Sequence, residues 1–212
     1  MAIDVKTNEV LWVEKYRPQR VDDTILSPKL KTTFKKFIED DSVPNLLLSG
    51  GPGVGKTTVA KAMLDEMGCD YIIKNGSLDM SIDTLRYDIS AYASAVSLAG
   101  GRKYVILDEA DYLSASKIQP ALRNFIEEYS SNCGFIFTCN FKNRMIAPLR
   151  SRLSEVDFTI QNSDKPKLAA SFYKRVLEIL NNEQVDYDNK VVAKVVEQHF
   201  PDFRRVLTEL QS

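Results

Sequence analysis

Five short apolar runs recur along the chain, separated by longer stretches in which apolar residues repeat at helical spacing. The runs are rich in Leu, Ile, Val, Phe and Tyr, and they occupy residues 45–50, 71–76, 103–109, 134–140 and 155–160. Such runs are typical of buried parallel strands. Two intervening stretches each gather apolar residues on one helical face: Ile118, Leu122, Phe125, Ile126 and Tyr129, and Leu85, Ile89, Tyr92 and Val96. This alternation predicts an α/β fold, a doubly wound parallel sheet with helices on both faces.

The pattern changes after Ile160, where the polar stretch "QNSDKP" begins at Gln161. Beyond it only helical spacing is found, and the first such stretch repeats an apolar residue every four positions at Leu168, Phe172, Val176 and Leu180. We therefore predict two domains, a nucleotide-binding domain over residues 1–160 and a small all-helical domain over residues 161–212.

Composition narrows the functional classes. The 212 residues carry 28 Lys and Arg against 29 Asp and Glu, a net charge of −1, so any nucleic-acid contact must come from a local face. Cys69, Cys133 and Cys139 lack metal-site spacing and read as reduced thiols. No apolar run reaches membrane-spanning length, and "MAIDVKTNEV" does not resemble a signal peptide, so we expect a cytoplasmic protein without a membrane contact.

The stretch "GGPGVGKT", Gly50 to Thr57, carries the strongest chemical signal. It lies between a predicted strand and a predicted helix, the context that a phosphate-binding loop requires. Three glycines, Gly51, Gly53 and Gly55, allow backbone N–H groups to approach phosphate oxygens. Lys56 is placed to bind the β and γ phosphates, and the hydroxyl of Thr57 to bind Mg²⁺. The alternative is a glycine-rich turn before a helix.

Acidic and amide side chains follow two of the other strands. Asp108 and Glu109 end the run "YVILDE", and Asn140 ends "GFIFTCN". At the carboxyl end of a parallel sheet, Asp108 can hold magnesium and Glu109 can deprotonate a water. Asn140 can polarise that water or contact the γ phosphate. The alternatives are a solvated acidic turn and an Asn that ends its strand by turn chemistry. Since no guanine-reading motif is present, adenine is the expected base.

Six segments together resemble one family. They are "WVEKYRP", "GGPGVGKTT", "VILDEAD", Asn140, "PLRSRL" and "PDFRRVLTELQS", spread from Trp12 to Ser212. They resemble the AAA+ module of sliding-clamp loader subunits, such as the replication factor C small subunits and, more closely, the large subunit of the T-even phage loader. The resemblance implies a P-loop AAA+ module followed by a helical lid, and an ATPase that uses ATP and Mg²⁺.

The resemblance also implies residue roles. Residues near the start would frame the adenine pocket: Val13, Glu14, Lys15, Tyr16, Arg17 and Ile25. The phosphate loop would add Val54 and Thr58. Arg204 would reach the γ phosphate from the lid, with a plain surface arginine as the alternative. Arg152 would complete the site of an adjacent subunit, and Arg150 would lie at the surface. The alternative for Arg152 is a structural ion pair with an acid such as Glu155 or Asp157.

The implied partners are other loader subunits, a sliding clamp and primer–template DNA. Met80 stands where relatives often carry a DNA-contacting arginine, so Arg86 is the better candidate, against a solvated helix face. Residues 112–118 would face the clamp, against an ordinary exposed helix start. The family's C-terminal collar has no counterpart before Ser212, so this chain alone is expected to be largely monomeric. Two further classes stay open, another AAA+ ATPase such as a helicase loader and a nucleotide-dependent scaffold without turnover.

Overall fold

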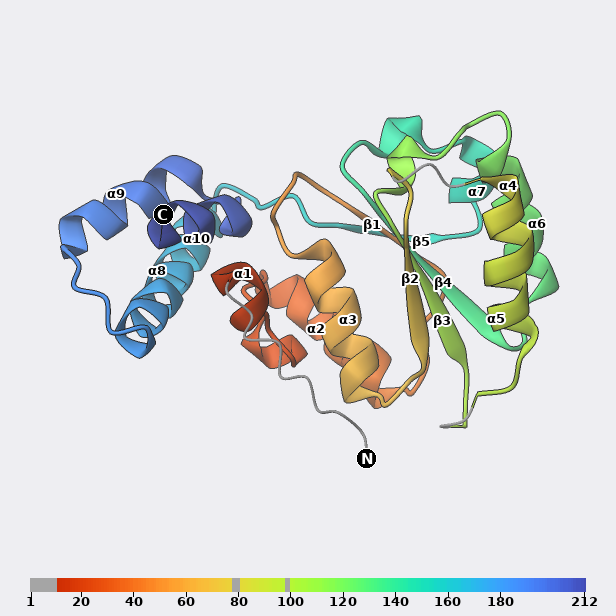
Figure 1. Cartoon of the computed structure of the whole chain (residues 1–212), viewed down its shortest axis with the longest axis horizontal. Coiled ribbons are helices and arrows are strands. Elements are labelled where there is room, and N and C mark those ends of the chain that lie inside the picture. Colours follow the sequence, from red (N-terminus) through yellow and green to blue (C-terminus); the bar gives the residue numbers. More distant parts are fainter. Residues whose placement is uncertain (1–10, 78–80, 98–99) are drawn as a thin grey trace.

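A five-stranded, wholly parallel sheet forms the larger part of the molecule (Figure 1). The computed structural model describes residues 11–77, 81–97 and 100–212. The strand order is β2-β3-β4-β1-β5, with β1 (Leu46–Ser49), β2 (Tyr71–Asn75), β3 (Lys103–Asp108), β4 (Cys133–Cys139) and β5 (Ser154–Asp157). Consecutive strands are not always neighbours, and every pair is parallel, which confirms the predicted doubly wound α/β fold.

Two layers of helices cover the sheet. One face carries α2 (Pro28–Glu39) and α3 (Lys56–Glu66), and the other carries α4 (Ile82–Thr84), α5 (Ser90–Ser94), α6 (Ile118–Glu128) and α7 (Ala147–Arg150) (Figure 1). Alternate side chains of a strand point to opposite faces. Leu46 and Leu48 therefore pack with Phe34 and Met63 under α2 and α3, while Leu47 packs with the opposite layer.

The edge strands correct one expectation. The central strands β1 and β4 are buried throughout, as the apolar runs predict. In contrast, β5 buries only Val156, and Ile73 of β2 is exposed. An edge strand has a neighbouring strand on one side only. An apolar run in the sequence therefore does not imply that every residue of such a strand is buried.

The stretch around residues 82–96 differs from the single helix face that was predicted. The helix is interrupted by a π-helical segment, η2 (Leu85–Ile89), between α4 and α5. Ile89 is buried and Tyr92 packs against the same core, but Val96 is 88% exposed because the helix has ended and Ala95 is extended. A π turn holds more residues than an α turn, which shifts the face that later residues present.

Three helices form a separate apolar core at the C-terminal side: α8 (Lys165–Asn182), α9 (Asn189–His199) and α10 (Phe203–Gln211). The predicted stripe of Leu168, Phe172, Val176 and Leu180 is buried in it. Trp12 of α1 (Trp12–Lys15) packs into this core too, so a segment from the start of the chain contributes to the helical unit (Figure 1). The domain boundary at residues 160 and 161 stays a prediction.

Two smaller observations complete the fold. The three cysteines have free thiols. Across residues 11–77, 81–97 and 100–212, none of the helices has both the length and the apolar character needed to span a bilayer.

Candidate nucleotide-binding site

One cavity lies where the loop after β1, the carboxyl ends of β3 and β4, helix α1 and the C-terminal helices meet. Most of the candidate residues predicted from the sequence line it, namely Val13, Glu14, Tyr16, Arg17, Ile25, Gly53, Val54, Gly55, Lys56, Thr57, Thr58, Asp108, Glu109, Asn140 and Arg204. Parallel strands end at the same edge of a sheet, which is why residues so distant in the sequence converge there. Their individual roles stay predictions.

The loop between β1 and α3 has the backbone shape of a phosphate cradle. Gly53 and Gly55 have φ values of +70° and +87°, which L side chains rarely adopt, and Gly55 is the N-cap of α3. The Lys56 ammonium donates to the carbonyl oxygens of Gly50 (2.8 Å) and Gly51 (2.7 Å). Gly51 itself does not line the cavity, so its contribution is this carbonyl. Burial of the Lys56 ammonium lowers the pKa of that group.

The carboxylate of Asp108 joins the loop to the sheet. The hydroxyl of Thr57 donates to Asp108 Oδ1 over 2.7 Å, and the hydroxyl of Thr138 in β4 donates to the same oxygen. Thr138 also accepts the backbone N–H of Glu109 (3.1 Å). One buried hydroxyl thus fixes both acids, a role that the sequence pattern did not reveal because threonine is common in strands.

Glu109 has a left-handed backbone, with φ +54° and ψ +42°. A residue with a side chain pays about 1–3 kcal/mol for such a conformation, and these conformations gather at functional sites. Here the conformation ends β3 and starts η3 (Ala110–Tyr112) at once, so that the Glu109 side chain lines the cavity.

Asn140 follows β4 directly, and its Oδ1 accepts a hydrogen bond from Lys56 (2.9 Å). The backbone of the next residue is fixed as well, because the N–H of Phe141 donates to the buried carboxylate of Asp111 (3.1 Å). Asp111 belongs to the same acidic stretch as Glu109, yet it lies outside the cavity and supports the turn that carries Asn140. The sequence did not single it out.

Helix α1 and the residues after it form one wall. The hydroxyl of Tyr16 donates to Glu183, just after α8, and Lys15 Nζ donates to the same oxygen over 2.6 Å. Lys15 was expected to frame the adenine pocket, but it does not line the cavity, because its ammonium is turned toward Glu183. Arg17 pairs with Glu14 and donates to the hydroxyl of Thr58 (3.4 Å).

The C-terminal helices close the opposite wall. Phe172, Arg175 and Ile179 of α8 line the cavity with Phe203 and Leu207 of α10. The N–H of Phe203 donates to the carbonyl of Gly53 over 3.1 Å, so α10 begins directly on the phosphate loop. The spacing of the three α8 residues puts them on one helical face, a signal that could have identified them. Phe172, Ile179, Phe203 and Leu207, together with Val13 and Ile25, make this end of the cavity mostly apolar, and Arg175 is the charged residue that α8 adds to it.

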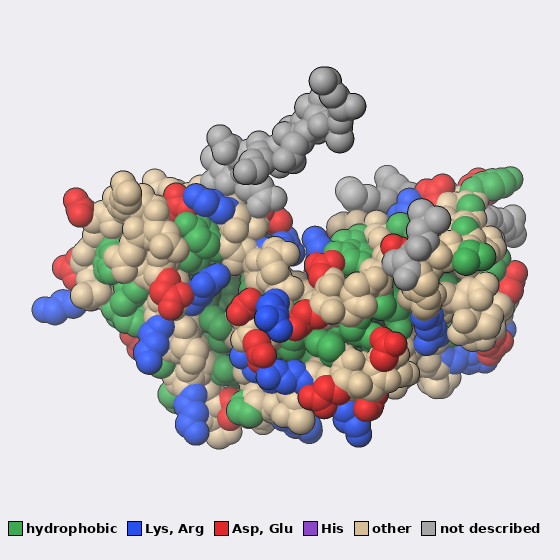
Figure 2. All heavy atoms as spheres, turned by 90° about the horizontal axis from the view of Figure 1, so that it is seen from below, with side chains coloured by type: hydrophobic (Ala, Val, Ile, Leu, Met, Phe, Trp, Pro, Cys, Tyr) green, Lys and Arg blue, Asp and Glu red, His purple; other side chains and the backbone are tan. Residues whose placement is uncertain are grey.

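The expected DNA and clamp contacts stay untested. Met80 lies outside the described residues, and although Arg86 belongs to η2, its side chain is not described. On the face seen in Figure 2, Lys and Arg side chains are interspersed with Asp and Glu, and no continuous basic field covers it. Tyr112, in the segment expected to face a clamp, is exposed, and the guanidinium of Arg144 lies over its ring.

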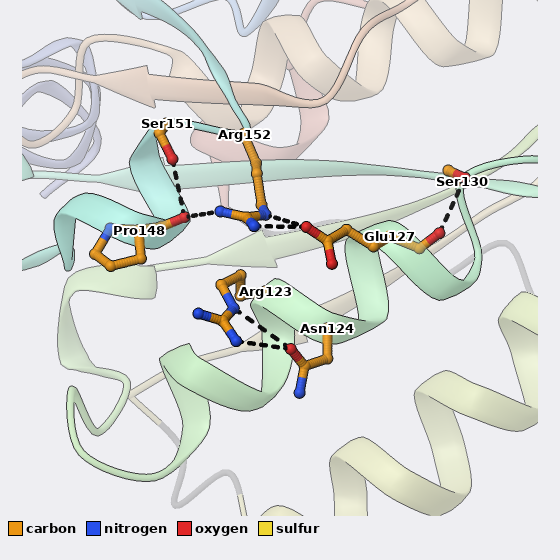
Figure 3. Close-up of polar contacts among 7 residues, drawn as sticks. All are labelled: Arg123, Asn124, Glu127, Ser130, Pro148, Ser151 and Arg152. Carbon is orange, nitrogen blue, oxygen red and sulfur yellow. Dashed lines mark hydrogen bonds and ion pairs between the residues drawn. The ribbon is translucent and has the colours of Figure 1, made fainter.

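Arg152 does not line this cavity. It follows α7, and its side chain reaches across to α6 (Figure 3). Nε donates to Glu127 Oε1 over 2.6 Å, and Nη1 donates to the carbonyl of Pro148 over 2.7 Å. Of the two acids suggested as structural partners, Glu155 pairs instead with Arg150, as expected for a surface arginine (2.6 Å). The acid that does bind Arg152 was not foreseen.

A phosphate loop after the first strand of a parallel sheet, acids at the end of β3 and a C-terminal helical unit against the loop define a P-loop nucleoside-triphosphatase. Residues 46–163, more than half of the chain, match the family described as "ATPase family associated with various cellular activities (AAA)". The chain belongs to this family.

Comparison with individual proteins gives more detail than the family match. The chain is 38% identical over 211 residues to the sliding-clamp-loader large subunit of Escherichia phage RB69, covering 98% of this chain and 66% of that protein. It is 34% identical to the replication factor C small subunit of Sulfurisphaera tokodaii, covering 96% of this chain and 62% of that protein. The chain therefore spans just under two thirds of the length of these relatives.

Among solved structures, the RuvB Holliday junction branch migration motor of Thermotoga maritima is similar in fold. The TM-score is 0.69 at 16% identity, and the likeness covers 92% of this chain and 63% of that one. At this identity the likeness concerns the fold alone.

Proposed function

We propose that the protein is an ATPase subunit of a DNA-polymerase sliding-clamp loader. The observation that carries the proposal is a cavity that gathers Lys56, Thr57, Asp108 and Glu109, in a chain whose relatives include the sliding-clamp-loader large subunits of two phages. ATP binding would close an assembly of subunits around clamp and DNA, and hydrolysis would release both.

ATP fits the cavity in one orientation. The apolar end, formed by α1, α8 and α10, suits adenine, and the loop suits the phosphates. Lys56 would exchange its contacts with loop carbonyls for the β and γ phosphates, because an ammonium prefers an anion to a neutral carbonyl.

Magnesium fits the oxygens at the other end. Thr57 and Asp108 lie within hydrogen-bonding distance of one another, and a hydroxyl with a carboxylate is the oxygen set that this hard cation prefers. These two residues would hold the ion. When bound, Mg²⁺ neutralises charge that develops on the phosphates.

Hydrolysis needs a base, and Glu109 is the candidate. Its backbone conformation directs the side chain into the cavity, where it would accept a proton from the attacking water. Asn140 would orient that water or the γ phosphate from the end of β4. Arg204 would reach the phosphates from α10, which already lies against Gly53.

Arg152 would act on a neighbour. Its position outside the cavity of its own subunit supports this role, since a guanidinium bound to α6 and α7 has no contact with its own phosphate loop. Such a residue, donated by an adjacent subunit, is worth about 10³–10⁵ in rate in other phosphoryl-transfer proteins. The partners would be the other loader subunits, the clamp and primer–template DNA, in the cytoplasm of the cell, or of the host if the gene is a phage gene.

The test is steady-state ATP hydrolysis by the assembled complex, measured alone, with clamp, with primed DNA, and with both. A loader is expected to respond strongly to clamp and primed DNA together. Stimulation by DNA alone or by a helicase alone would favour another AAA motor, and binding of ATP without turnover under any condition would favour a scaffold.

A further inference from the structure

The contacts of Arg152 in the separate subunit point to a second residue with a role in hydrolysis. Glu127 lies in the last turn of α6, and its Oε1 contacts two nitrogens of the Arg152 guanidinium, Nε at 2.6 Å and Nη2 at 2.5 Å. The third nitrogen, Nη1, donates to the carbonyl of Pro148 in α7 (Figure 3). The guanidinium is therefore fixed from two helices.

A count of N–H bonds shows what these contacts leave available. A guanidinium carries five N–H bonds, one on Nε and two on each terminal nitrogen. Among the described residues, the contacts of Arg152 use one N–H bond on each of its three nitrogens, which leaves one on Nη1 and one on Nη2. Two N–H bonds on the terminal nitrogens match two oxygens of one phosphate. A phosphate can thus be bound without the loss of Glu127.

We propose that Glu127 is a positioning residue that presents the outer end of the Arg152 guanidinium to the nucleotide of a neighbouring subunit. This inference rests on the proposed function, in which Arg152 acts across an interface. The side chain of an arginine has several rotatable bonds, and holding them in one conformation to bind a phosphate costs conformational entropy. Because Glu127 already orders the guanidinium of Arg152, that cost does not arise at the moment of reaction.

The neighbourhood supports this assignment of Glu127. Arg123 lies one helical turn earlier on α6, where an i, i+4 pair with Glu127 would be possible. Its guanidinium instead contacts the side chain of Asn124, at 3.3 and 3.4 Å, and the carboxylate of Glu127 serves Arg152 (Figure 3). The carbonyl of Pro148 is itself oriented, because it also accepts the hydroxyl of Ser151 at 3.1 Å.

A purely structural role is the competing explanation, and exposure argues against it. The Glu127 side chain is 58% exposed and that of Arg152 31% exposed, and ion pairs this open to solvent contribute little to folding stability. Loss of Glu127 should therefore leave the subunit folded while the guanidinium loses its direction. The other competing explanation is that Glu127 holds Arg152 in an inactive position. That explanation predicts faster ATP hydrolysis once Glu127 is removed.

The experiment measures kcat and KM for ATP in the assembled complex with clamp and primed DNA. Glu127→Ala should lower kcat by about 10- to 100-fold, the scale on which misplacement of a catalytic group slows a reaction. KM should change little, since the nucleotide is held by the other subunit. Glu127→Gln keeps an acceptor oxygen and should lose less. Glu128→Ala, an exposed neighbour on the same turn, is the matched control and should behave as wild type.

The decisive arm repeats Glu127→Ala in an Arg152→Ala background. If Glu127 acts through Arg152, the double variant hydrolyses ATP at the rate of Arg152→Ala alone, and the melting temperatures of all variants stay close to that of wild type. A further loss in the double variant would overturn the inference, as would wild-type or faster turnover by Glu127→Ala when Arg152→Ala is inactive. Wild-type turnover by Arg152→Ala would overturn both the proposed role of Arg152 and this inference.

Discussion

Replacement of Gly53 by alanine should separate the phosphate loop from α10. A Cβ atom at this position would lie 1.8 Å from Asp202 Oδ1 and 2.5 Å from Asp202 Cγ, and the backbone has φ +70°. The overlap forces Asp202 to move. Asp202 is also the N-cap of α10, where its carboxylate accepts the N–H of Arg205 over 3.0 Å. The new methyl group therefore disturbs both the cap and the contact between the two segments.

The loss of unfolding free energy caused by Gly53→Ala has three contributions. A left-handed conformation costs a residue with a side chain about 1–2 kcal/mol. Loss of an N-cap costs about 0.5–2 kcal/mol. The hydrogen bond from the N–H of Phe203 to Gly53 contributes about 0.5–1.5 kcal/mol. Gly53→Ala should then lower the free energy of unfolding by about 2–5.5 kcal/mol, the sum of these three ranges.

Gly55→Ala is the matched control. Its φ of +87° imposes similar strain, but no heavy atom lies within 4 Å of the new Cβ, so about 1–2 kcal/mol should be lost. The assay is urea unfolding without nucleotide, together with calorimetric titration of ATP. Asp202→Ala in the Gly53→Ala background removes the overlap and should give a double-variant loss about 1 kcal/mol smaller than the sum of the single losses. The reasoning would be refuted if Gly53→Ala and Gly55→Ala lowered the free energy of unfolding equally. It would also be refuted if the losses caused by Gly53→Ala and Asp202→Ala were strictly additive in the double variant.

Three further predictions concern the site, a lid contact and DNA. Glu109→Gln should keep ATP affinity and slow turnover by ~100- to 10,000-fold in the assembled complex, and near-normal turnover would remove Glu109 as the base. The hydrogen bond from Lys15 lowers the pKa of Glu183 below 4.5, so this carboxylate stabilises the fold above that pH and less as the pH falls. In Glu183→Gln the acid-induced loss of unfolding free energy should therefore be smaller, and an unchanged pH profile would contradict it. Arg86→Ala should weaken DNA binding equally for all sequences and reduce its salt dependence, and unchanged affinity would remove Arg86 from the interface.

The sequence predicted the elements whose signals are local. Five apolar runs became five strands, and the phosphate loop, Asp108 and Asn140 converged because each lies at the carboxyl end of a strand of one parallel sheet. The apolar face of α6, from Ile118 to Tyr129, was also predicted, because its residues repeat at helical spacing within one continuous segment of the chain.

The features that were missed depend on distant parts of the chain. Glu127 and Arg152 are 25 positions apart, and nothing in either segment indicates their pairing. The hydroxyl of Thr138 acquires its role only because β4 lies beside β3. Lys15 turns away from the cavity because Glu183, directly after α8 and 168 positions away in the sequence, is a stronger partner for an ammonium than an apolar pocket would be.

The dependence of hydrolysis on a neighbouring subunit can be tested most directly by mixing two inactive variants. Lys56→Ala removes the cradle of a subunit, and Arg152→Ala removes the guanidinium that we assign to the next one. Each variant alone should be inactive in the assembled complex. In mixed assemblies some interfaces join an intact cradle to an intact Arg152, and ATP hydrolysis should partly return, with a maximum near equal amounts of the two variants. If Arg152 serves the site of its own subunit, every site in the mixture lacks one part, and hydrolysis that stays absent at all ratios would contradict the account.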